Sequence, residues 1–294
     1  MERLLHLPDL IAAMAEALAA FSSGRVVQPV RLVVPVAEHQ GFLGAMPAYT
    51  GSLGAKLVTF YPNNRGLPTH HALIALFDPE TGAPLAVMDG RLITELRTAA
   101  VSAVATRLLA RPESSVLGIL GSGVQARSHL AALRLVRTFR EVRVWSPRNA
   151  GTFAAQLGLT AVNSAEQAVR GADVVVVATS SQVPVLFGAW LTPGVHVNAV
   201  GATRPTWREL DDEALARGRL FVDSREAASL ESGDVRAAVQ SVTELGEVLA
   251  GARPGRGTSD EITLFKSVGL AVEDVAAAAL VYRGQQRSPD RPGS

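Results

Sequence analysis

The residues best suited to chemistry begin with a glycine-rich turn, which reads Leu-Gly-Ile-Leu-Gly-Ser-Gly-Val-Gln-Ala over residues 117–126. It gives the spacing Gly-x-Gly-x-x-Ala directly after a short apolar run and at the start of a helical pattern. In that context the glycines allow a tight turn and let backbone N–H groups approach a pyrophosphate, and the alanine allows close packing. The turn predicts a dinucleotide site that comprises Gly121, Ser122, Gly123, Val124, Gln125 and Ala126.

The end of the next predicted strand indicates which dinucleotide is preferred. NAD enzymes usually present Asp or Glu here to the ribose 2′-hydroxyl. This chain has instead Trp145-Ser146-Pro147-Arg148-Asn149 and no carboxylate. Arg148 can pair with a 2′-phosphate while Ser146 donates a hydrogen bond, and Asn149 completes this group. We therefore expect NADPH as the cofactor, with NADH possible if Arg148 is only a solvated residue.

Small residues after two further predicted strands extend this site. Thr179 follows the run Val174-Val175-Val176-Val177, and Val200-Gly201 end the next strand. The carboxyl ends of parallel strands meet at one edge of the sheet, where a nicotinamide binds. Ordinary turn chemistry explains Thr179 equally well.

Three cations outside this region interrupt apolar stretches, namely Arg31, Lys56 and Arg97. A charge in a strand or on an alanine-rich helix face is costly unless it is paired or functional. Taken singly, each fits a solvated or ion-paired residue better than a ligand.

The elements that position these residues fall into two patterns. Short runs at 31–36, 41–46, 55–60, 71–77 and 84–88 are separated by turn signals and predict an antiparallel sheet, after an amphipathic helix at 1–21 and before a helix at 93–110. From residue 115 strands at 116–120, 141–145, 173–178 and 196–200 alternate with helices, which predicts a parallel, doubly wound sheet. A last helix is expected at 265–282, before a polar, disordered tail at 285–294.

Composition restricts the partners. The chain has 28 Lys and Arg against 27 Asp and Glu, so no net field attracts nucleic acid or an anionic membrane. It has no cysteine, which fits a reducing cytoplasm, and no apolar run of the roughly 20 residues that a bilayer span needs. The six histidines do not show metal-ligand spacing, so no metal is expected.

The chain resembles the ornithine cyclodeaminase and mu-crystallin family, and the mu-crystallin branch is the most similar. The resemblance extends from about Phe21 to Tyr282. It is carried by the segments 46–49, 56–62, 66–70, 88–90, 97–100, 121–126, 198–202, 207–213, 231–234 and 265–269.

This resemblance implies a homodimer in which a Rossmann domain is inserted into an α+β substrate and dimerisation domain with an antiparallel sheet. We expect the Rossmann domain at 114–261 and the other domain at 1–113 plus 262–294. The family's carboxylate-binding residues match Arg31, Lys56 and Arg97, and Lys56 is also suited to deliver a proton to an imine nitrogen. His70 matches a position that lines the substrate pocket, although a structural histidine fits as well, and Thr98 is assigned to the cofactor site.

One departure from the family points to the reaction. Cyclodeaminases carry an Asp where this chain has Thr203, and a neutral hydroxyl cannot act as a carboxylate base. Reduction of a protonated cyclic imine needs only a hydride and a carboxylate anchor. The sequence therefore favours an NAD(P)H-dependent reductase of pyrroline-2-carboxylate or piperideine-2-carboxylate, giving proline or pipecolate. The alternatives are an ornithine cyclodeaminase, an alanine or N-alkyl amino acid dehydrogenase, and a non-catalytic, crystallin-like binding protein.

Overall fold

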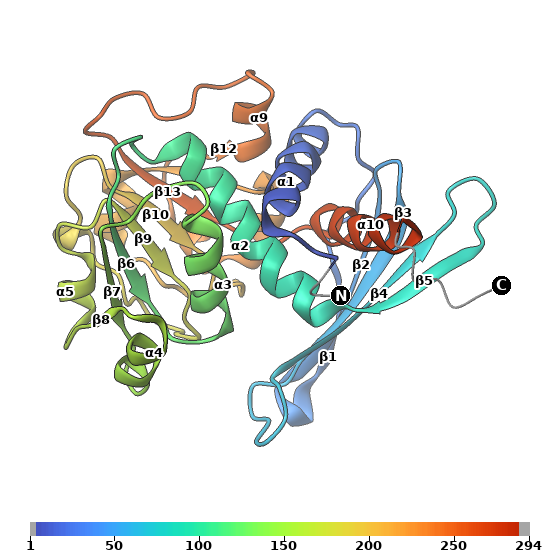
Figure 1. The fold of residues 1–294 in the computed structure, drawn as a ribbon, viewed down its shortest axis with the longest axis horizontal. Helices are drawn as coiled ribbons and strands as arrows, with labels where there is room; N and C mark the ends of the chain where they lie inside the picture. The colour runs from blue at the N-terminus through green and yellow to red at the C-terminus, as the bar shows by residue number, and fades with distance from the viewer. Residues whose placement is uncertain (1–3, 288–294) are drawn as a thin grey trace. The chain divides into compact units, whose positions relative to one another are not determined.

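The computed structural model describes residues 4–287 and divides the chain into two compact units (Figure 1). Unit 1 combines residues 1–97 and 270–294, and unit 2 is the continuous segment 98–269. The units divide the chain at 97/98 and 269/270, whereas the sequence predicted domain boundaries at 113/114 and 261/262. Two elements account for the difference. Helix α2 (Gly90–Leu109) contributes to both units, and strand β13 (Ile262–Lys266) belongs to the sheet of unit 2.

Unit 1 is built on a five-stranded antiparallel sheet whose strands follow one another in chain order. All five strands lie where the sequence predicted them, because β-branched runs alternate with turn residues. Lys56 pairs with Met46 on one side and with Ile74 on the other. The strands are β1 (Leu32–Val36), β2 (Gly41–Tyr49), β3 (Leu53–Phe60), β4 (His70–Phe77) and β5 (Pro84–Asp89).

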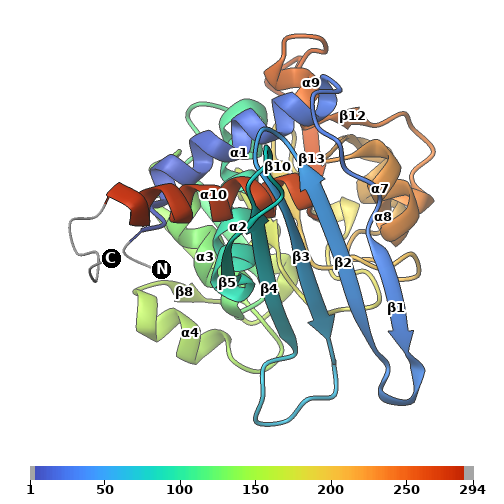
Figure 2. The ribbon, with the colours of Figure 1, turned by 90° about the vertical axis from the view of Figure 1, so that its right-hand side faces the viewer.

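The two faces of this sheet differ. Helix α10 (Ala271–Arg287) lies across β2, β3 and β4, and α1 (Leu7–Ser22) packs on α10 (Figure 2). On the covered face Met46 and Ile74 are buried. On the other face the strand alternation presents Leu57, Leu73 and Val87, which are 46 to 69 % exposed. Unit 1 therefore has one packed and one open apolar sheet face.

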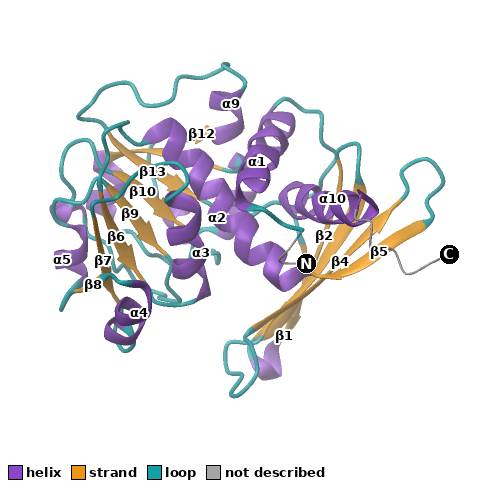
Figure 3. Cartoon of the chain, viewed as in Figure 1, coloured by secondary structure: helices purple, strands orange, loops and turns teal. Residues whose placement is uncertain are grey.

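Unit 2 is built on an eight-stranded sheet in the order β12-β11-β13-β10-β9-β6-β7-β8, and all its paired strands are parallel (Figure 3). This confirms the doubly wound sheet. Its strands are β6 (Val116–Leu120), β7 (Glu141–Trp145), β8 (Thr160–Ala161), β9 (Val174–Val177), β10 (His196–Ala199), β11 (Gly218–Val222), β12 (Thr243–Glu244) and β13 (Ile262–Lys266). Its helices include α3 (Val124–Leu133), α4 (Ala150–Leu157), α5 (Ala165–Val169), α6 (Asp212–Arg217), α7 (Arg225–Glu231), α8 (Gly233–Ala237) and α9 (Leu245–Leu249).

The strand order creates a switch point beside β6. The chain passes from β6 to β7 and β8 on one side and then returns to β9 on the other side. Residues Val174 to Val177 of β9 are fully buried, as expected of a central strand covered on both faces. Open α/β sheets bind ligands outside the carboxyl ends of their strands at such a point.

The last helix was predicted to begin at Phe265, and this start was wrong. Phe265 and Lys266 end strand β13, and helix α10 begins at Ala271, after Gly269 with φ of 79°. The run Ile-Thr-Leu-Phe is rich in β-branched and aromatic residues, so strand propensity prevailed over helical spacing. Helix α10 also continues through 285–287, which the sequence assigned to a disordered tail. The rest of that tail, and residues 1–3 of the first predicted helix, lie outside the described residues.

Between residues 4 and 287, none of the helices has both the length and the apolar character that crossing a bilayer requires.

Candidate active site

The glycine-rich turn joins β6 to α3 and has a geometry that only glycine tolerates at its first position. Gly121 has φ of 118°, and a Cβ added there would lie 2.3 Å from the carbonyl oxygen of Ala178. Ala126 is fully buried, so helix α3 packs closely on the sheet. The turn is therefore held tightly against the end of β9.

The start of α3 is open. Gly123 occupies the N-cap position without a side-chain cap, and a Cβ added to Gly123 would meet no atom within 4 Å. The first N–H groups of a helix lack partners within the helix and carry a positive partial charge. This opening fits a pyrophosphate.

The end of β7 carries the residues predicted to select the dinucleotide. The hydroxyls of Ser146 and Ser122 lie 2.8 Å apart, and Ser146 Oγ accepts from the Asn149 N–H at 3.2 Å. Ser146 therefore links the glycine-rich turn to the loop after β7. Arg148 is exposed and forms no hydrogen bond or ion pair with residues 4–287.

The ends of β9 and β10 are tied together by a residue that the sequence did not single out. Glu209 is fully buried, and its Oε1 accepts from the N–H and the hydroxyl of Thr179 at 2.9 and 2.7 Å. Its Oε2 accepts from the N–H groups of Gly201 and Ala202 at 2.7 and 3.1 Å. Thr179 thus uses its hydroxyl hydrogen inside the protein, while Val200 continues the ladder to Val177.

In unit 1 two of the predicted cations meet two carboxylates of α10. Lys56 Nζ lies 2.6 Å from Asp274 Oδ2, and Arg97 binds Asp274 Oδ1 through Nε at 2.9 Å and Glu273 Oε2 through Nη1 at 2.6 Å. All four side chains are at most 5 % exposed. Hereafter these four residues are called the ionic cluster.

Burial sets the protonation state of the ionic cluster. It lowers the pKa of Lys56 to about 8; the charge of Asp274 opposes this shift, and the charges of Arg97 and Arg31 reinforce it. Although burial alone would raise the pKa of Asp274, Arg97 and Lys56 hold it below its usual range. With this pKa Lys56 is able to exchange a proton near neutral pH, and its protonation depends on both other predicted cations.

The remaining predicted residues are more scattered. His70 begins β4 four positions from Ile74, the partner of Lys56, which is roughly 13 Å along the strand. It is exposed and stacks on Phe60 with a centroid distance of 4.5 Å. Thr203 is half-buried in the loop after β10, and Thr98 lies within α2 at 9 % exposure.

Comparison with known proteins places the chain in a family. The model of the ornithine cyclodeaminase/mu-crystallin family matches residues 1–288. The chain belongs to this family. It is also 52 % identical over 286 residues to the ketimine reductase mu-crystallin of Mus musculus, covering 93 % of this chain and 91 % of that protein.

Solved structures of the ornithine cyclodeaminase/mu-crystallin family have the same fold. The Delta(1)-pyrroline-2-carboxylate reductase of Thermococcus litoralis, solved in complex with NADH and L-proline, matches with a TM-score of 0.92 and 39 % identity, over 97 % of this chain and 95 % of that one. An archaeal alanine dehydrogenase dimer with bound NAD matches with a TM-score of 0.91 and 39 % identity, over 97 % and 93 % of the two chains.

Three buried acidic residues of this family member were not predicted from the sequence, namely Glu273, Asp274 and Glu209. Glu273 and Asp274 interrupt the apolar, alanine-rich start of α10, which is the same signal that singled out Arg97. Glu209 carries no such signal, because it follows another charged residue, Arg208, and does not interrupt an apolar stretch. Its burial depends on the loops around it. The nearby Asp211 has a structural role, since its side chain caps α6 by accepting from the Ala214 N–H.

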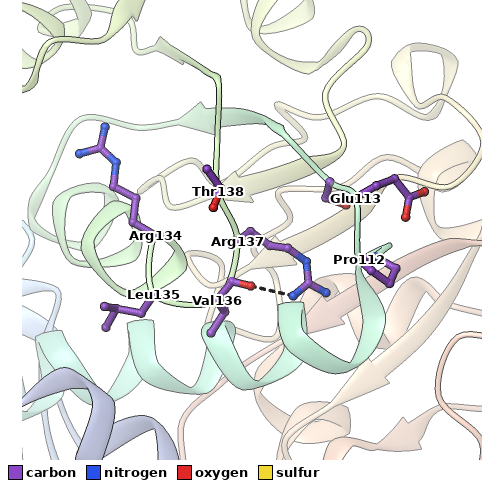
Figure 4. Close-up of a pocket in the computed structure, with 8 residues that line it drawn as sticks. Pro112, Glu113, Arg134, Leu135, Val136, Arg137 and Thr138 are labelled. Atoms are coloured by element: carbon purple, nitrogen blue, oxygen red, sulfur yellow. Dashed lines mark hydrogen bonds between the residues drawn. The ribbon is translucent and has the colours of Figure 1, made fainter.

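A hollow of about 460 Å³ in unit 2 is unrelated to the predicted site (Figure 4). Arg137 in its wall donates to the carbonyl oxygens of Val136, Thr106 and Ala110 and so caps the end of α2. A guanidinium engaged in this way serves the helix rather than a ligand. No group of three or more metal-ligating side chains occurs within residues 4–287.

Proposed function

We propose that this protein reduces the C=N bond of small cyclic imino acids, pyrroline-2-carboxylate and piperideine-2-carboxylate, to L-proline and L-pipecolate with NADPH. The carrying observation is the burial of Lys56 and Arg97 in one cluster within reach of Arg31, in a chain that is 52 % identical to a ketimine reductase. The reductase solved with NADH and L-proline supports the same substrate class.

In this proposal unit 1 anchors the substrate carboxylate. Arg31 and Arg97 offer planar guanidinium groups that match a carboxylate, and Lys56 adds a third positive charge. Glu273 and Asp274 bind Arg97 through contacts of 2.6 and 2.9 Å, so the orientation of its guanidinium is set before the substrate binds. Thr203 and His70 are assigned to the periphery of the substrate site.

Lys56 is assigned to proton delivery. When bound, the dinucleotide supplies a hydride to the imine carbon; the C=N electron pair moves to nitrogen, which holds a proton and becomes the ring amine. Lys56, with a pKa of about 8, is largely protonated at pH 7 and able to give that proton. Asp274 keeps the ammonium in place at 2.6 Å.

In unit 2 the proposal assigns the pyrophosphate to residues 121–126 and the 2′-phosphate to Arg148. Solved relatives contain NADH or NAD, so the preference for NADPH rests on this chain alone. It is supported by the exposed Arg148 and by the absence of Asp or Glu from the run Trp145–Asn149.

We further propose that the protein is a homodimer. The open sheet face of unit 1 carries Val34, Leu43, Leu57, Leu73 and Val87, each at least 38 % exposed. A contiguous apolar face of this kind is typical of an interface. The archaeal alanine dehydrogenase was solved as a dimer. Replacing the cross-strand pair Leu57 and Leu73 with Asp should give monomers in light scattering, whereas Val239→Asp, at a 99 % exposed position in unit 2, should leave the dimer intact.

The reaction is tested by following NADPH oxidation with each of the two cyclic imines, with NADH as the alternative donor and with ornithine plus NAD in a parallel assay. We expect turnover with the imines and none with ornithine, because Thr203 stands where a cyclodeaminase has its Asp. Proline formation from ornithine, without imine reduction, would refute the proposal. Turnover only with an open-chain keto acid and an amine would favour the alanine or N-alkyl amino acid dehydrogenase.

A further inference from the structure

Glu209 connects two loops with both oxygens of one carboxylate. Oε1 accepts two hydrogen bonds from Thr179, two residues beyond the end of β9, and Oε2 accepts from the Gly201 and Ala202 N–H groups, just beyond the end of β10. β9 and β10 are neighbours, with Val177 paired to Ala199. The carboxylate therefore fixes the separation of two adjacent loops at the carboxyl edge of the sheet.

The residues of the two loops pack closely around this carboxylate. A Cβ added to Gly201 would lie 2.2 Å from Glu209 Oε1 and 2.2 Å from the carbonyl oxygen of Thr179. The neighbouring residue Ala178 in turn restricts Gly121 of the dinucleotide turn. The glycine-rich turn and the loops after β9 and β10 thus form one closely packed row.

Two further buried charges hold Glu209 itself. Asp234 Oδ1 accepts from the N–H groups of Glu209 and Leu210, both at 3.0 Å. Lys266 Nζ lies 3.3 Å from Asp234 Oδ2 and 3.8 Å from Glu209 Oε2, and all three side chains are fully buried. Burial raises the pKa of Glu209, while Lys266 and the Thr179 donors favour its charged form. The two carboxylates accept hydrogen bonds from backbone N–H groups, while Lys266 Nζ contributes its charge without a hydrogen bond to any described residue. Buried charges are costly, and pairing with hydrogen bonding of this kind fixes the geometry of the two carboxylates.

We propose that Glu209, held by Asp234 and Lys266, is a positioning residue for hydride transfer. It fixes the loops that receive the nicotinamide end of the dinucleotide, whereas the turn at 121–126 and Arg148, which are not among the hydrogen-bond partners of Glu209, hold the adenosine and phosphate end. This inference rests on the proposed dinucleotide-dependent reduction. It separates two functions within unit 2: Glu209 governs where the nicotinamide lies and contributes little to the binding of the rest of the dinucleotide.

The test compares Glu209→Gln with wild type in two measurements. The first is single-turnover hydride transfer from NADPH deuterated or unlabelled at C4, and the second is binding of 2′-phospho-ADP-ribose, which lacks the nicotinamide. The amide presents its NH₂ group to backbone or hydroxyl donors, so one loop loses its acceptor. We expect hydride transfer to slow ~10- to 100-fold, as small misplacements of reactants do, while fragment binding is unchanged.

Asp223→Asn is the matched control. Asp223 is another fully buried carboxylate of unit 2, and it accepts from the N–H groups of Ser224, Val268 and Gly269 and from the Ser267 hydroxyl. Its loss should lower stability and leave the isotope effect on hydride transfer at the wild-type value. Thr179→Val removes the bond from the hydroxyl to Glu209 and the bond that the hydroxyl accepts from the Ser181 N–H, but leaves the other three bonds of Glu209 in place. It should slow hydride transfer less than Glu209→Gln, with the fold retained.

Wild-type rates of hydride transfer in Glu209→Gln would overturn the positioning role, as would an equal loss of fragment binding or an equal loss of hydride transfer in Asp223→Asn. These results are distinct from failure of the proposed function, in which wild type itself neither binds the fragment nor oxidises NADPH with either imine.

Discussion

The two units bury charge in opposite ways. In unit 1, Lys56 and Arg97 are buried against Glu273 and Asp274, so two cations meet two carboxylates. In unit 2, Glu209 and Asp234 share the single ammonium of Lys266, and the remaining negative charge is met by backbone N–H groups. The charges of unit 1 compensate one another, whereas the carboxylates of unit 2 are used to hold loops.

This difference separates charge that binds from charge that positions. Arg97 is held by the side chains of Asp274 and Glu273 at 2.9 and 2.6 Å, in the unit to which we assign the substrate carboxylate. The Glu209 carboxylate instead accepts four hydrogen bonds from residues of two loops. Substitutions in unit 1 should therefore act mainly on substrate use, and those in unit 2 on geometry and stability.

The largest effect is expected from Arg97→Ala. It removes the residue that we propose as a ligand of the substrate carboxylate and leaves Glu273 and Asp274 less compensated, so we expect kcat/KM for the imine to fall on the order of a thousandfold. Stability should fall by roughly 3–5 kcal/mol, the usual cost of breaking a buried ion pair. Steady-state kinetics, NADPH titration and urea unfolding measure the three quantities, and NADPH affinity should not change.

Arg111→Ala is the control for this substitution, because Arg111 also pairs with a carboxylate, Asp173, at 2.7 Å, but lies in unit 2. It should lower stability and spare kcat/KM. Equal losses of kcat/KM in the two variants would erase the distinction between the units.

The next effect is a loss of stability in acid that arises in unit 2. Burial lowers the pKa of His129 to about 4, so this ring is neutral in the folded protein, with Nδ1 donating to Gln125 O and Nε2 accepting from Ser102. Below the unfolded pKa of about 6.5 the unfolded chain takes up the proton, so stability falls as the pH drops from 6.5 towards 4, by roughly 3 kcal/mol. Urea unfolding at a series of pH values should show this slope.

His129→Gln, which keeps a donor and an acceptor, should flatten part of that slope. An unchanged slope in this variant would show that His129 does not contribute to the acid sensitivity.

Arg148→Ala should act on cofactor choice. The guanidinium is exposed, so its removal costs little stability, while KM for NADPH should rise roughly 10- to 100-fold with KM for NADH unchanged. Initial rates with the two cofactors at saturating imine give both values, and Arg134→Ala, at another exposed arginine of unit 2, serves as the control. A parallel rise for both cofactors would remove Arg148 from the 2′-phosphate site.

The smallest effect is expected from Asp274→Asn, on the pH dependence of unit 1. Lys56 must be protonated to deliver a proton, so activity should decline as the pH rises through about 8. Without the negative charge of Asp274 the pKa of Lys56 falls further, and the alkaline limb of kcat/KM should move to lower pH by about one unit.

Glu273→Gln is the matched control, since Glu273 binds Arg97 while Asp274 binds both Arg97 and Lys56. The alkaline limb of kcat/KM should move less in Glu273→Gln than in Asp274→Asn. The imine titrates identically in every variant, so differences between variants report on Lys56. An identical profile in wild type and Asp274→Asn would mean that Lys56 does not supply the proton.

The sequence predicted those parts of the fold that depend on local pattern. The strands of unit 1 and the glycine-rich turn were located correctly because turn residues and β-branched runs mark them within a few positions. β11 and β13 were missed. β13 enters the sheet between β10 and β11, and this placement depends on contacts between distant segments.

The site divides in the same way. Arg31, Lys56 and Arg97 stand out because charge interrupts an apolar pattern, and the structure buries two of them, Lys56 and Arg97, against Glu273 and Asp274. Glu209 and Lys266 do not stand out, because the burial of Glu209 depends on the packing of loops and that of Lys266 on the insertion of β13 between β10 and β11. Roles that depend on long-range packing cannot be read from neighbours in sequence.

The edges of the five-stranded sheet in unit 1 affect how this protein can aggregate. Its outer strands are β1 and β5, and each contains a proline, Pro35 and Pro84, whose nitrogen has no hydrogen to donate. Addition of further strands along an edge is the usual route to fibrils, and a missing donor on each edge disfavours it. The open apolar face permits two sheets to associate face to face, and this association closes at a dimer. The unit therefore combines an apolar interface with protection against the growth of fibrils.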